Sequence, residues 1–245
     1  MNTSWETITV DHSPMNLYVI QPDGPGPFPA VVVIQNQDGV ADFTQEMTRR
    51  IAEAGYIGVA PDLYHRNTPE INADHHKRAA NRRDAEVLND VNATVNFLRG
   101  CGVADTGRLG IVGFCMGGRV AFLMAAANSV FRAAVDFYGG GVYKGWGNGR
   151  SPAEHAAEIS CPIQGHFGEL DKNPPPDEMR TLDAELTRLG KFHEFYFYPG
   201  AGHAFNRKGW DGYRPDADAA SWPRTLDFFR KYLGEIAPKK AAAAR

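Results

Sequence analysis

The sequence alternates short runs of apolar residues with longer amphipathic segments. The clearest apolar run is residues 30–35 (AVVVIQ), whose β-branched residues are typical of a strand buried on both faces. Residues 44–54 follow with helical spacing, and Gly55 ends that segment. Strand–helix alternation of this kind predicts an α/β fold, with a mostly parallel sheet and helices on both of its faces.

The same pattern continues along the chain, and an alternating segment precedes it. Residues 7–10 and 15–20 alternate as expected for an antiparallel hairpin at a sheet edge. Further strands are predicted at residues 56–60, 108–112, 132–137, 163–167 and 192–198. Further helices are predicted at residues 74–99, 116–127, 175–189 and 218–233. In parallel sheets reactive groups collect at the carboxyl ends of the strands, so we expect the site there.

Length and composition restrict the class of protein. A chain of 245 residues fits one domain, predicted at residues 1–237 with a disordered tail at residues 238–245. The net charge of −3 argues against nucleic-acid or anionic-membrane partners, which recruit basic surfaces. No apolar run is long enough to span a bilayer, and no secretory signal is visible. Three cysteines without a pairing pattern suit the cytoplasm.

One strand–helix junction has the pattern of a nucleophile elbow. Gly113-Phe114-Cys115-Met116-Gly117 is Gly-x-Cys-x-Gly, with cysteine in the place that serine usually takes. A sharp turn there needs glycine on both sides, because a β-carbon would clash. The turn also places the thiol at a helix N-terminus, where the dipole favours the thiolate. A buried structural cysteine is the alternative, but the position after a strand and before an apolar helix favours a nucleophile.

A base and an acid are expected further along the chain. His203 lies in a glycine-rich loop directly after the last predicted strand, where the base of an elbow hydrolase belongs. The acid should lie between nucleophile and base, and Asp171 ends the preceding strand-and-loop segment. Glu169 and Asp136 are its rivals. Cys115, Asp171 and His203 all fall at carboxyl ends of predicted strands, which predicts a catalytic triad.

These motifs resemble the dienelactone hydrolase family of α/β-hydrolases, which includes carboxymethylenebutenolidases. The resemblance runs through Pro61-Asp62-Leu63-Tyr64, the elbow, the Asp171 region and Gly200-Ala201-Gly202-His203-Ala204-Phe205, from about residue 15 to residue 233. It implies an α/β-hydrolase fold, a Cys–His–Asp triad and hydrolysis of small lactones or activated esters, without a metal or organic cofactor. It also implies that Arg207 binds a substrate carboxylate.

The chain departs from the family after the first long strand. The family usually has a glutamate there that contacts the thiol, and Gln37 is taken to occupy its position. A glutamine cannot act as a base, so either His203 with the helix dipole activates the thiol, or Asp38 does. We favour His203, because an aspartate beside Gly39 is typical of a turn. A second carboxylate-binding arginine could be Arg78, Arg82 or Arg83.

The expected reaction is acyl transfer from a small ester or lactone to Cys115. The oxyanion is expected to bind the backbone N–H of Met116 and one from the 37–38 loop, assigned to Asp38. Gln37, Tyr64 and Arg207 are expected to contact the substrate, and Tyr138, Tyr143 and Trp146 to line the pocket. The alternatives are a broad esterase or thioesterase acting on uncharged acyl groups, and a non-catalytic ligand-binding or redox-sensing module on the same fold. The oligomeric state is left open.

Overall fold

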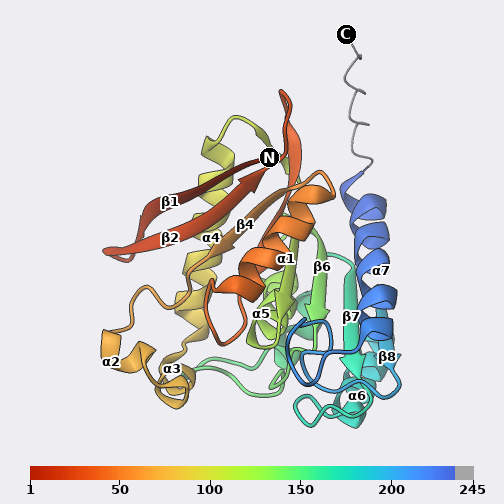
Figure 1. The fold of residues 1–245 in the computed structure, drawn as a ribbon. Helices are drawn as coiled ribbons and strands as arrows, with labels where there is room; N and C mark the ends of the chain where they lie inside the picture. Colours follow the sequence, from red (N-terminus) through yellow and green to blue (C-terminus); the bar gives the residue numbers. More distant parts are fainter. Residues whose placement is uncertain (235–245) are drawn as a thin grey trace.

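The computed structural model describes residues 1–234, which form one eight-stranded sheet with helices on both sides (Figure 1). The predicted domain end at residue 237 and the predicted tail at residues 238–245 lie outside the described residues. In the order β1-β2-β4-β3-β5-β6-β7-β8, each strand pairs with its neighbours. The strands are β1 (Asn2–Val10), β2 (Ser13–Gln21), β3 (Phe28–Ile34), β4 (Ile57–Pro61), β5 (Ala104–Phe114), β6 (Phe131–Phe137), β7 (Ile163–Gly168) and β8 (His193–Tyr198).

The sheet is parallel except at one edge. β1 pairs antiparallel with β2, and β2 pairs antiparallel with β4. The pairs from β4 to β8 are all parallel. This confirms the predicted edge hairpin and the mostly parallel α/β sheet. Because β3, β5, β7 and β8 run in the same direction, the loops that follow them emerge at one edge of the sheet.

Two apolar cores lie on opposite faces of the sheet. Alternate residues of β3 belong to different cores, with Val32 and Ile34 in one and Val31 and Val33 in the other. The first core is closed by α4 (Asp84–Gly100), α5 (Met116–Ala127) and α6 (Pro176–Arg188). The second is closed by α1 (Asp42–Glu53) and α7 (Pro215–Leu233), which lie on the near face in Figure 1. Burial on both faces explains the continuous β-branched run.

The prediction of one long helix at residues 74–99 is wrong, because the structure has two helices there. The chain forms α3 (His75–Asn81) and then α4, with Arg82 and Arg83 extended between them. The break has a tertiary cause, because Asp84 is buried and accepts two hydrogen bonds from the guanidinium of Arg119 on α5. That contact fixes where α4 begins and turns the 82–83 segment toward the sheet edge that carries the elbow.

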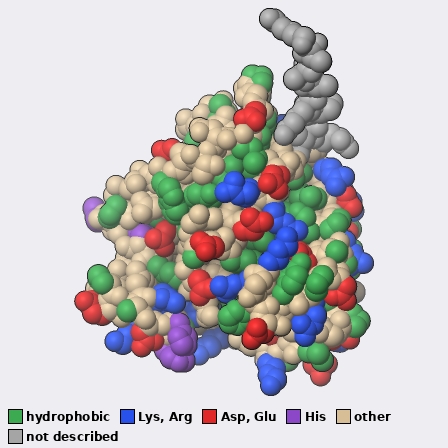
Figure 2. Space-filling model, in the orientation of Figure 1, with side chains coloured by type: hydrophobic (Ala, Val, Ile, Leu, Met, Phe, Trp, Pro, Cys, Tyr) green, Lys and Arg blue, Asp and Glu red, His purple; other side chains and the backbone are tan. Residues whose placement is uncertain are grey.

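Short elements and surface charge complete the fold. A one-turn helix α2 (Pro69–Asn72) and a 3-10 helix at Ala153–Glu158 were not predicted, because such short pieces carry no periodic signal. On the face shown in Figure 2, acidic and basic side chains are interspersed. Within residues 1–234, no helix has both the length and the apolar character needed to cross a bilayer.

Candidate active site

Cys115 lies at the tip of the turn between β5 and α5. Its φ of 58° and ψ of −121° are unusual for a residue with a side chain, so the turn is strained. The backbone N–H of Cys115 donates to the carbonyl of Phe137 at 2.9 Å, which ties the turn to the end of β6. The side chain is half-buried. The strained turn therefore lifts the thiol above the sheet without exposing it fully.

The two glycines of the motif are needed because backbone packs against them. A β-carbon on Gly113 would collide with the carbonyl of Gly117 in the first turn of α5. A β-carbon on Gly117 would collide with the carbonyls of Ile34 and Gln35 at the end of β3. The glycines thus let β5, α5 and β3 meet around Cys115, as the sequence pattern indicated.

His203 and Asp171 come together from two neighbouring loops. Nδ1 of His203, in the loop after β8, lies 2.9 Å from Oδ2 of Asp171, in the loop after β7. Asp171 is 5% exposed, and its Oδ1 accepts the backbone N–H of Asn173 at 2.8 Å. Both carboxylate oxygens are therefore engaged. The bond to Nδ1 leaves the other ring nitrogen of His203 for Cys115, with which the imidazole also shares a side-chain hydrogen bond.

The two rival acids do not contact His203. Glu169 is exposed and pairs with Arg180 at 3.3 Å. Asp136 is 1% exposed, and its Oδ1 accepts the backbone N–H of Gly139 at 2.7 Å. Burial raises the pKa of Asp136 to about 8, against which the hydrogen bond from Gly139 acts. Asp136 therefore supports the loop after β6, while Asp171 faces the imidazole.

The surroundings of His203 favour its protonated form. Desolvation lowers the pKa of His203, but hydrogen bonds to Asp171 and Cys115 and the negative charge of both partners outweigh it. Together they raise the pKa to about 10. The ring of Tyr138 packs against His203, with centroids 4.9 Å apart, and limits its rotation. At neutral pH the imidazole therefore carries a proton that it can give away.

Within residues 1–234, two backbone N–H groups near the thiol have no acceptor, and the N–H of Asp38 is not one of them. Met116 is the first residue of α5, so its N–H has no partner within the helix. The assignment of the second donor to Asp38 is wrong, because the Asp38 N–H donates to Oδ1 of Asn36 at 3.0 Å. No acceptor within residues 1–234 faces the N–H of Gln37. Gln37 is therefore the donor that this loop offers.

The side chains of Gln37 and Tyr64 also differ from expectation. Gln37 is exposed, and Asn36, at 6% exposed, is the buried side chain after Gln35, so Gln37 does not fill a buried position beside the thiol. The hydroxyl of Tyr64 lies 3.2 Å from the carbonyl oxygen of Gln37 and 3.0 Å from Sδ of Met116. Tyr64 therefore connects the two segments that carry the free N–H groups.

Arg207 contacts the protein's own carboxylate. Nη1 of Arg207 lies 2.8 Å from Oδ2 of Asp38, which joins the loop after His203 to the loop after β3. The guanidinium also lies 5.1 Å from the ring centroid of Trp210 and 5.9 Å from that of Phe43. Asp38 is thus the ion-pair partner of Arg207.

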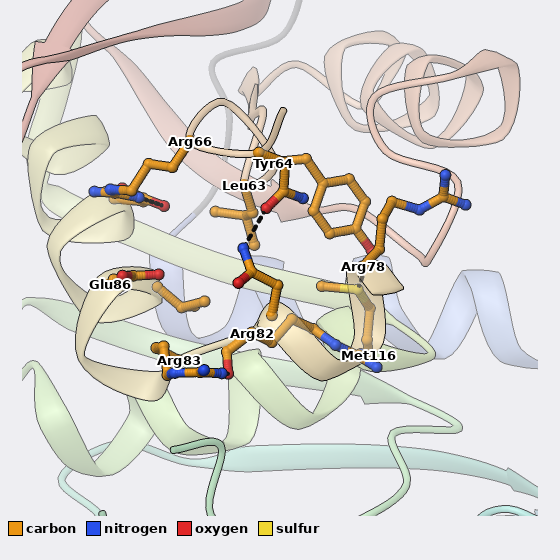
Figure 3. A pocket seen from close by; sticks show the side chains of 12 residues that line it. Leu63, Tyr64, Arg66, Arg78, Arg82, Arg83, Glu86 and Met116 are labelled. Atoms are coloured by element: carbon orange, nitrogen blue, oxygen red, sulfur yellow. Dashed lines mark hydrogen bonds and ion pairs between the residues drawn. The ribbon is translucent and has the colours of Figure 1, made fainter. Parts of the chain in front are cut away.

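A small cavity of about 20 Å³ that Tyr64 and Met116 line is also lined by four arginines, Arg66, Arg78, Arg82 and Arg83, of which the last three are the candidate carboxylate-binding residues (Figure 3). Burial lowers the pKa of Arg82, and charge interactions with Tyr64 and Cys115 act against this effect. Its guanidinium lies 4.5 Å from the ring centroid of Trp146. Arg78 donates to the backbone carbonyl of Asn72, and Arg83 is exposed. Arg82 therefore interacts through its charge with Cys115.

Sequence reasoning missed several supporting contacts. Tyr138 was expected to line the pocket, yet it is 1% exposed and donates to Oδ1 of Asn206 at 2.6 Å. Trp146 is packed between Arg82 and Arg119, and Tyr143 is exposed.

Within residues 1–234, no cluster of three or more His, Cys, Asp or Glu side chains could hold a metal ion. A strained turn, an imidazole–carboxylate pair and free N–H groups are the equipment of an acyl-transfer site.

Comparisons with known proteins agree with this geometry. The model of the "Dienelactone hydrolase family" matches residues 15–233. A "Putative carboxymethylenebutenolidase" of Methylorubrum extorquens is 35% identical over 228 residues, covering 88% of this chain and 76% of that one. A "Probable 2-oxo-3-(5-oxofuran-2-ylidene)propanoate lactonase" of Bradyrhizobium is 31% identical, covering 94% of both chains. The crystal structure of a "Putative Dienelactone Hydrolase" from Klebsiella pneumoniae superposes with a TM-score of 0.88 at 32% identity, covering 94% and 99%.

Proposed function

Because the chain belongs to the dienelactone hydrolase family and is a hydrolase, we propose that it cleaves a small ester or lactone through a thioester on Cys115. One observation carries the proposal. The thiol lies at the tip of a strained turn, within hydrogen-bonding contact of an imidazole whose Nδ1 is 2.9 Å from Asp171. A structural cysteine would need neither the strain nor the pair behind it.

In the proposed acylation step, the thiolate of Cys115 attacks the carbonyl carbon of the ester. His203 carries the proton in the resting enzyme, and it gives this proton to the departing alkoxide as the C–O bond breaks. Asp171 fixes the ring and stabilises its positive charge until then. For a lactone, the alcohol released by ring opening stays attached to the acyl group.

The negative oxygen of the tetrahedral intermediate is proposed to bind the N–H groups of Met116 and Gln37. Donors of this kind contribute about 3 kcal/mol each when they are fixed in advance. The hydroxyl of Tyr64 contacts both Gln37 and Met116, so it fixes the positions of the two N–H donors relative to each other. The helix dipole of α5 adds a favourable potential at the same place.

In the proposed deacylation step, His203 acts as a base. Once Cys115 is acylated, its negative charge is gone, and one of the two charges that raise the pKa of His203 is lost with it. The neutral imidazole then takes a proton from water, which attacks the thioester and releases the acid and the thiolate. The cycle ends with the proton on His203 again.

His203, rather than Asp38, is the proposed activator of the thiol. The carboxylate of Asp38 is paired with Arg207 at 2.8 Å, so it is not available as a base. The protonated imidazole stabilises the thiolate directly, in place of the glutamate that the family usually supplies. The exposed side chain of Gln37 takes no part in this step.

The relatives suggest the kind of substrate. One is named as a carboxymethylenebutenolidase and another as a lactonase, so a small lactone is the first substrate class to test. A small molecule is the proposed partner. Within residues 1–234 the cysteines are free, which supports the proposal that the enzyme works in the reducing cytoplasm.

Burst kinetics with p-nitrophenyl acetate test the proposed function. We expect a rapid release of about one p-nitrophenol per enzyme, followed by a slower steady rate as the thioester is hydrolysed. Cys115→Ala should lose both phases, and Cys101→Ala is the matched control for loss of a thiol. Full activity in a folded Cys115→Ala enzyme would refute the proposal.

A further inference from the structure

We propose that His65 is a positioning residue of the site. It anchors the segment after β4 to the buried carboxylate of Asp90, and so fixes Tyr64 and the two N–H donors that the Tyr64 hydroxyl holds. This inference rests on the proposed function, since it concerns the oxyanion site of the same reaction. It starts from the turn at residues 62–67, which follows β4 and carries Tyr64 and His65 next to each other.

The imidazole of His65 joins this turn to two other elements. Its Nε2 lies 3.1 Å from Oδ1 of Asp90 on α4, and its Nδ1 lies 3.0 Å from Oγ of Ser13 at the start of β2. The hydroxyl of Ser13 also donates to the carbonyl oxygen of His65 at 3.1 Å. The side chains of His65 and Asp90 are 2% and 1% exposed, so water cannot readily replace these contacts. The ring is therefore held from both sides.

Arg66, the next residue in the turn, is anchored on the same carboxylate. Its Nη1 lies 2.8 Å from Oδ2 of Asp90 and its Nη2 lies 2.7 Å from Oδ1, a two-point contact that fixes orientation as well as distance. Nη2 also lies 2.8 Å from Oδ2 of Asp11, between β1 and β2. Figure 3 shows the side chains of Arg66 and Tyr64 extending in opposite directions from this turn. Two consecutive residues therefore tie the turn to α4, while Tyr64 extends toward Met116.

The anchoring reaches Tyr64 through the backbone. The N–H of Tyr64 donates to Oδ1 of Asp62 at 2.9 Å, and its carbonyl accepts the N–H of Asn67 at 2.9 Å. Both backbone groups of Tyr64 are thus fixed within a turn that His65 and Arg66 hold in place. The ring of Tyr64, a residue only 8% exposed, takes its position from this backbone. A site that binds a transition state needs its groups placed to within about 0.5 Å, so a small displacement of the turn is enough to weaken it.

Ser13, His65 and Asp90 are the three residue types of a catalytic triad, but their surroundings favour a supporting role. The imidazole of a triad has to reach a substrate, as that of His203 does with a side chain that is 36% exposed. The side chain of His65 is 2% exposed and is enclosed by its two partners. His65 therefore acts through Tyr64 rather than on a substrate.

The test measures the burst phase with p-nitrophenyl acetate, whose maximal rate reports the acylation step. His65→Ala removes the contact with Asp90, whereas His65→Gln keeps a donor long enough to reach that carboxylate. We expect His65→Ala to lower the maximal burst rate about tenfold, and His65→Gln to recover most of this loss. The ester concentration that gives half of the maximal rate should stay within about twofold, because the oxyanion donors act in the transition state and not on the bound ester.

Tyr64→Phe tests whether His65 acts through the tyrosine hydroxyl. It should lower the burst rate about as much as His65→Ala does, and the double variant should be little slower than either, because both changes disturb the same donors. The inhibition constant of 1,1,1-trifluorooctan-2-one gives a second readout. The thiolate of Cys115 adds to its carbonyl carbon, the C=O π bond becomes a C–O⁻ group, and this oxyanion binds the same donors. The constant should therefore rise about tenfold in His65→Ala.

His193→Ala is the matched control, because His193 also pairs with an aspartate. Its Nε2 lies 3.0 Å from Oδ1 of Asp183, and it begins β8, at the opposite end of that strand from the loop of His203. Its burst rate and its inhibition constant should equal those of the wild type. A loss in His193→Ala equal to that in His65→Ala would show a general effect of removing a paired histidine and would overturn the inference.

Two other outcomes would also overturn it. One is a wild-type burst rate in a folded His65→Ala enzyme, and the other is a fully additive effect of His65→Ala and Tyr64→Phe. His65→Asn replaces His65→Ala if the latter does not fold, since asparagine is too short to reach Asp90. A burst that persists in Cys115→Ala would instead refute the proposed function, and this inference with it.

Discussion

The carboxylate of Asp171 lies 2.9 Å from Nδ1 of His203, although the two residues belong to different loops. Asp171 follows β7 and His203 follows β8, so the pairing of these two parallel strands brings the residues together. The side chain of Asp171 is 1% exposed and that of His203 36% exposed. A buried carboxylate thus holds an imidazole that reaches the site, an arrangement suited to acyl transfer.

Removing the charge of that acid should slow the enzyme. We expect Asp171→Asn to lower kcat by about 10²-fold and His203→Ala by about 10³-fold or more, because the imidazole serves both steps. Glu169→Gln is the matched control, since Glu169 is exposed and pairs with Arg180 instead. The measurement compares the steady-state rates of the variants on one ester, and thermal melting checks that each variant is folded. A larger loss in Glu169→Gln than in Asp171→Asn would mean that the acid is wrongly assigned.

The three thiols should differ in reactivity. Cys115 lies at the N-terminus of α5, whereas burial raises the pKa of Cys101 and raises that of Cys161 to about 12. Only the thiolate is nucleophilic, so iodoacetamide at neutral pH should label Cys115 on the order of tenfold faster or more than the others. Peptide mapping by mass spectrometry measures each rate. Faster labelling of Cys101 or Cys161, with activity retained, would contradict the assignment.

The pH dependence should reflect the raised pKa of His203. In the proposed mechanism the imidazolium protonates the leaving alkoxide, and its pKa of about 10 lies above the ordinary value of 6.5. For an ethyl ester, kcat/KM should therefore stay level through neutral pH and fall only in the alkaline range. Asp171→Asn removes one of the charges that raise this pKa, so the fall should move to lower pH. A wild-type fall centred near pH 6.5 would exclude the protonated resting state.

Asp136 should make the fold less stable as the pH rises. Its pKa is raised from 3.8 to about 8 by burial, so the folded protein holds a proton there that the unfolded chain releases above its ordinary pKa. Stability is then lost between these two values as pH increases. One pKa unit corresponds to about 1.4 kcal/mol, and 1 kcal/mol shifts the melting temperature of such a domain by roughly 2–4 °C.

Asp136→Asn should remove this dependence. The difference in melting temperature between the variant and the wild type should move in the variant's favour by several degrees from about pH 5 to about pH 8. Differential scanning calorimetry at both pH values measures it, and comparing differences cancels the other titrating groups. A constant difference across the pH range would mean that Asp136 is not protonated in the fold.

The regular parts of the fold could be predicted from the sequence because burial determines them locally. The β-branched run of β3 and the apolar helix α5 are continuous signals, and the helix bounds Met116–Ala127 agree with the prediction. The break before α4 could not be predicted, because it depends on a contact between Asp84 and Arg119, 35 residues apart. No local pattern in either segment indicates that contact.

In the candidate site, too, features set by local sequence could be predicted and features set by long-range contacts could not. Cys115 lies in a motif whose glycines are needed for close backbone packing, and His203 follows a loop in which Gly200 adopts a positive φ of 71°, so local sequence indicates both positions. The donor at Gln37 could not be told from one at Asp38, because the choice depends on which N–H the side chain of Asn36 accepts. The pairing of Arg207 with Asp38 depends on two loops that only the folded sheet brings together.

Intact-protein mass spectrometry after rapid mixing with a small lactone or ester tests the central claim most directly. We expect a covalent adduct with the mass of the substrate's acyl group on Cys115, located by peptide mapping, which accumulates at low pH where deacylation is slow. Ring opening of a lactone should give an adduct of the full lactone mass, because no alcohol leaves. Turnover with no adduct in the wild type, together with full activity in Cys115→Ala, would contradict the account.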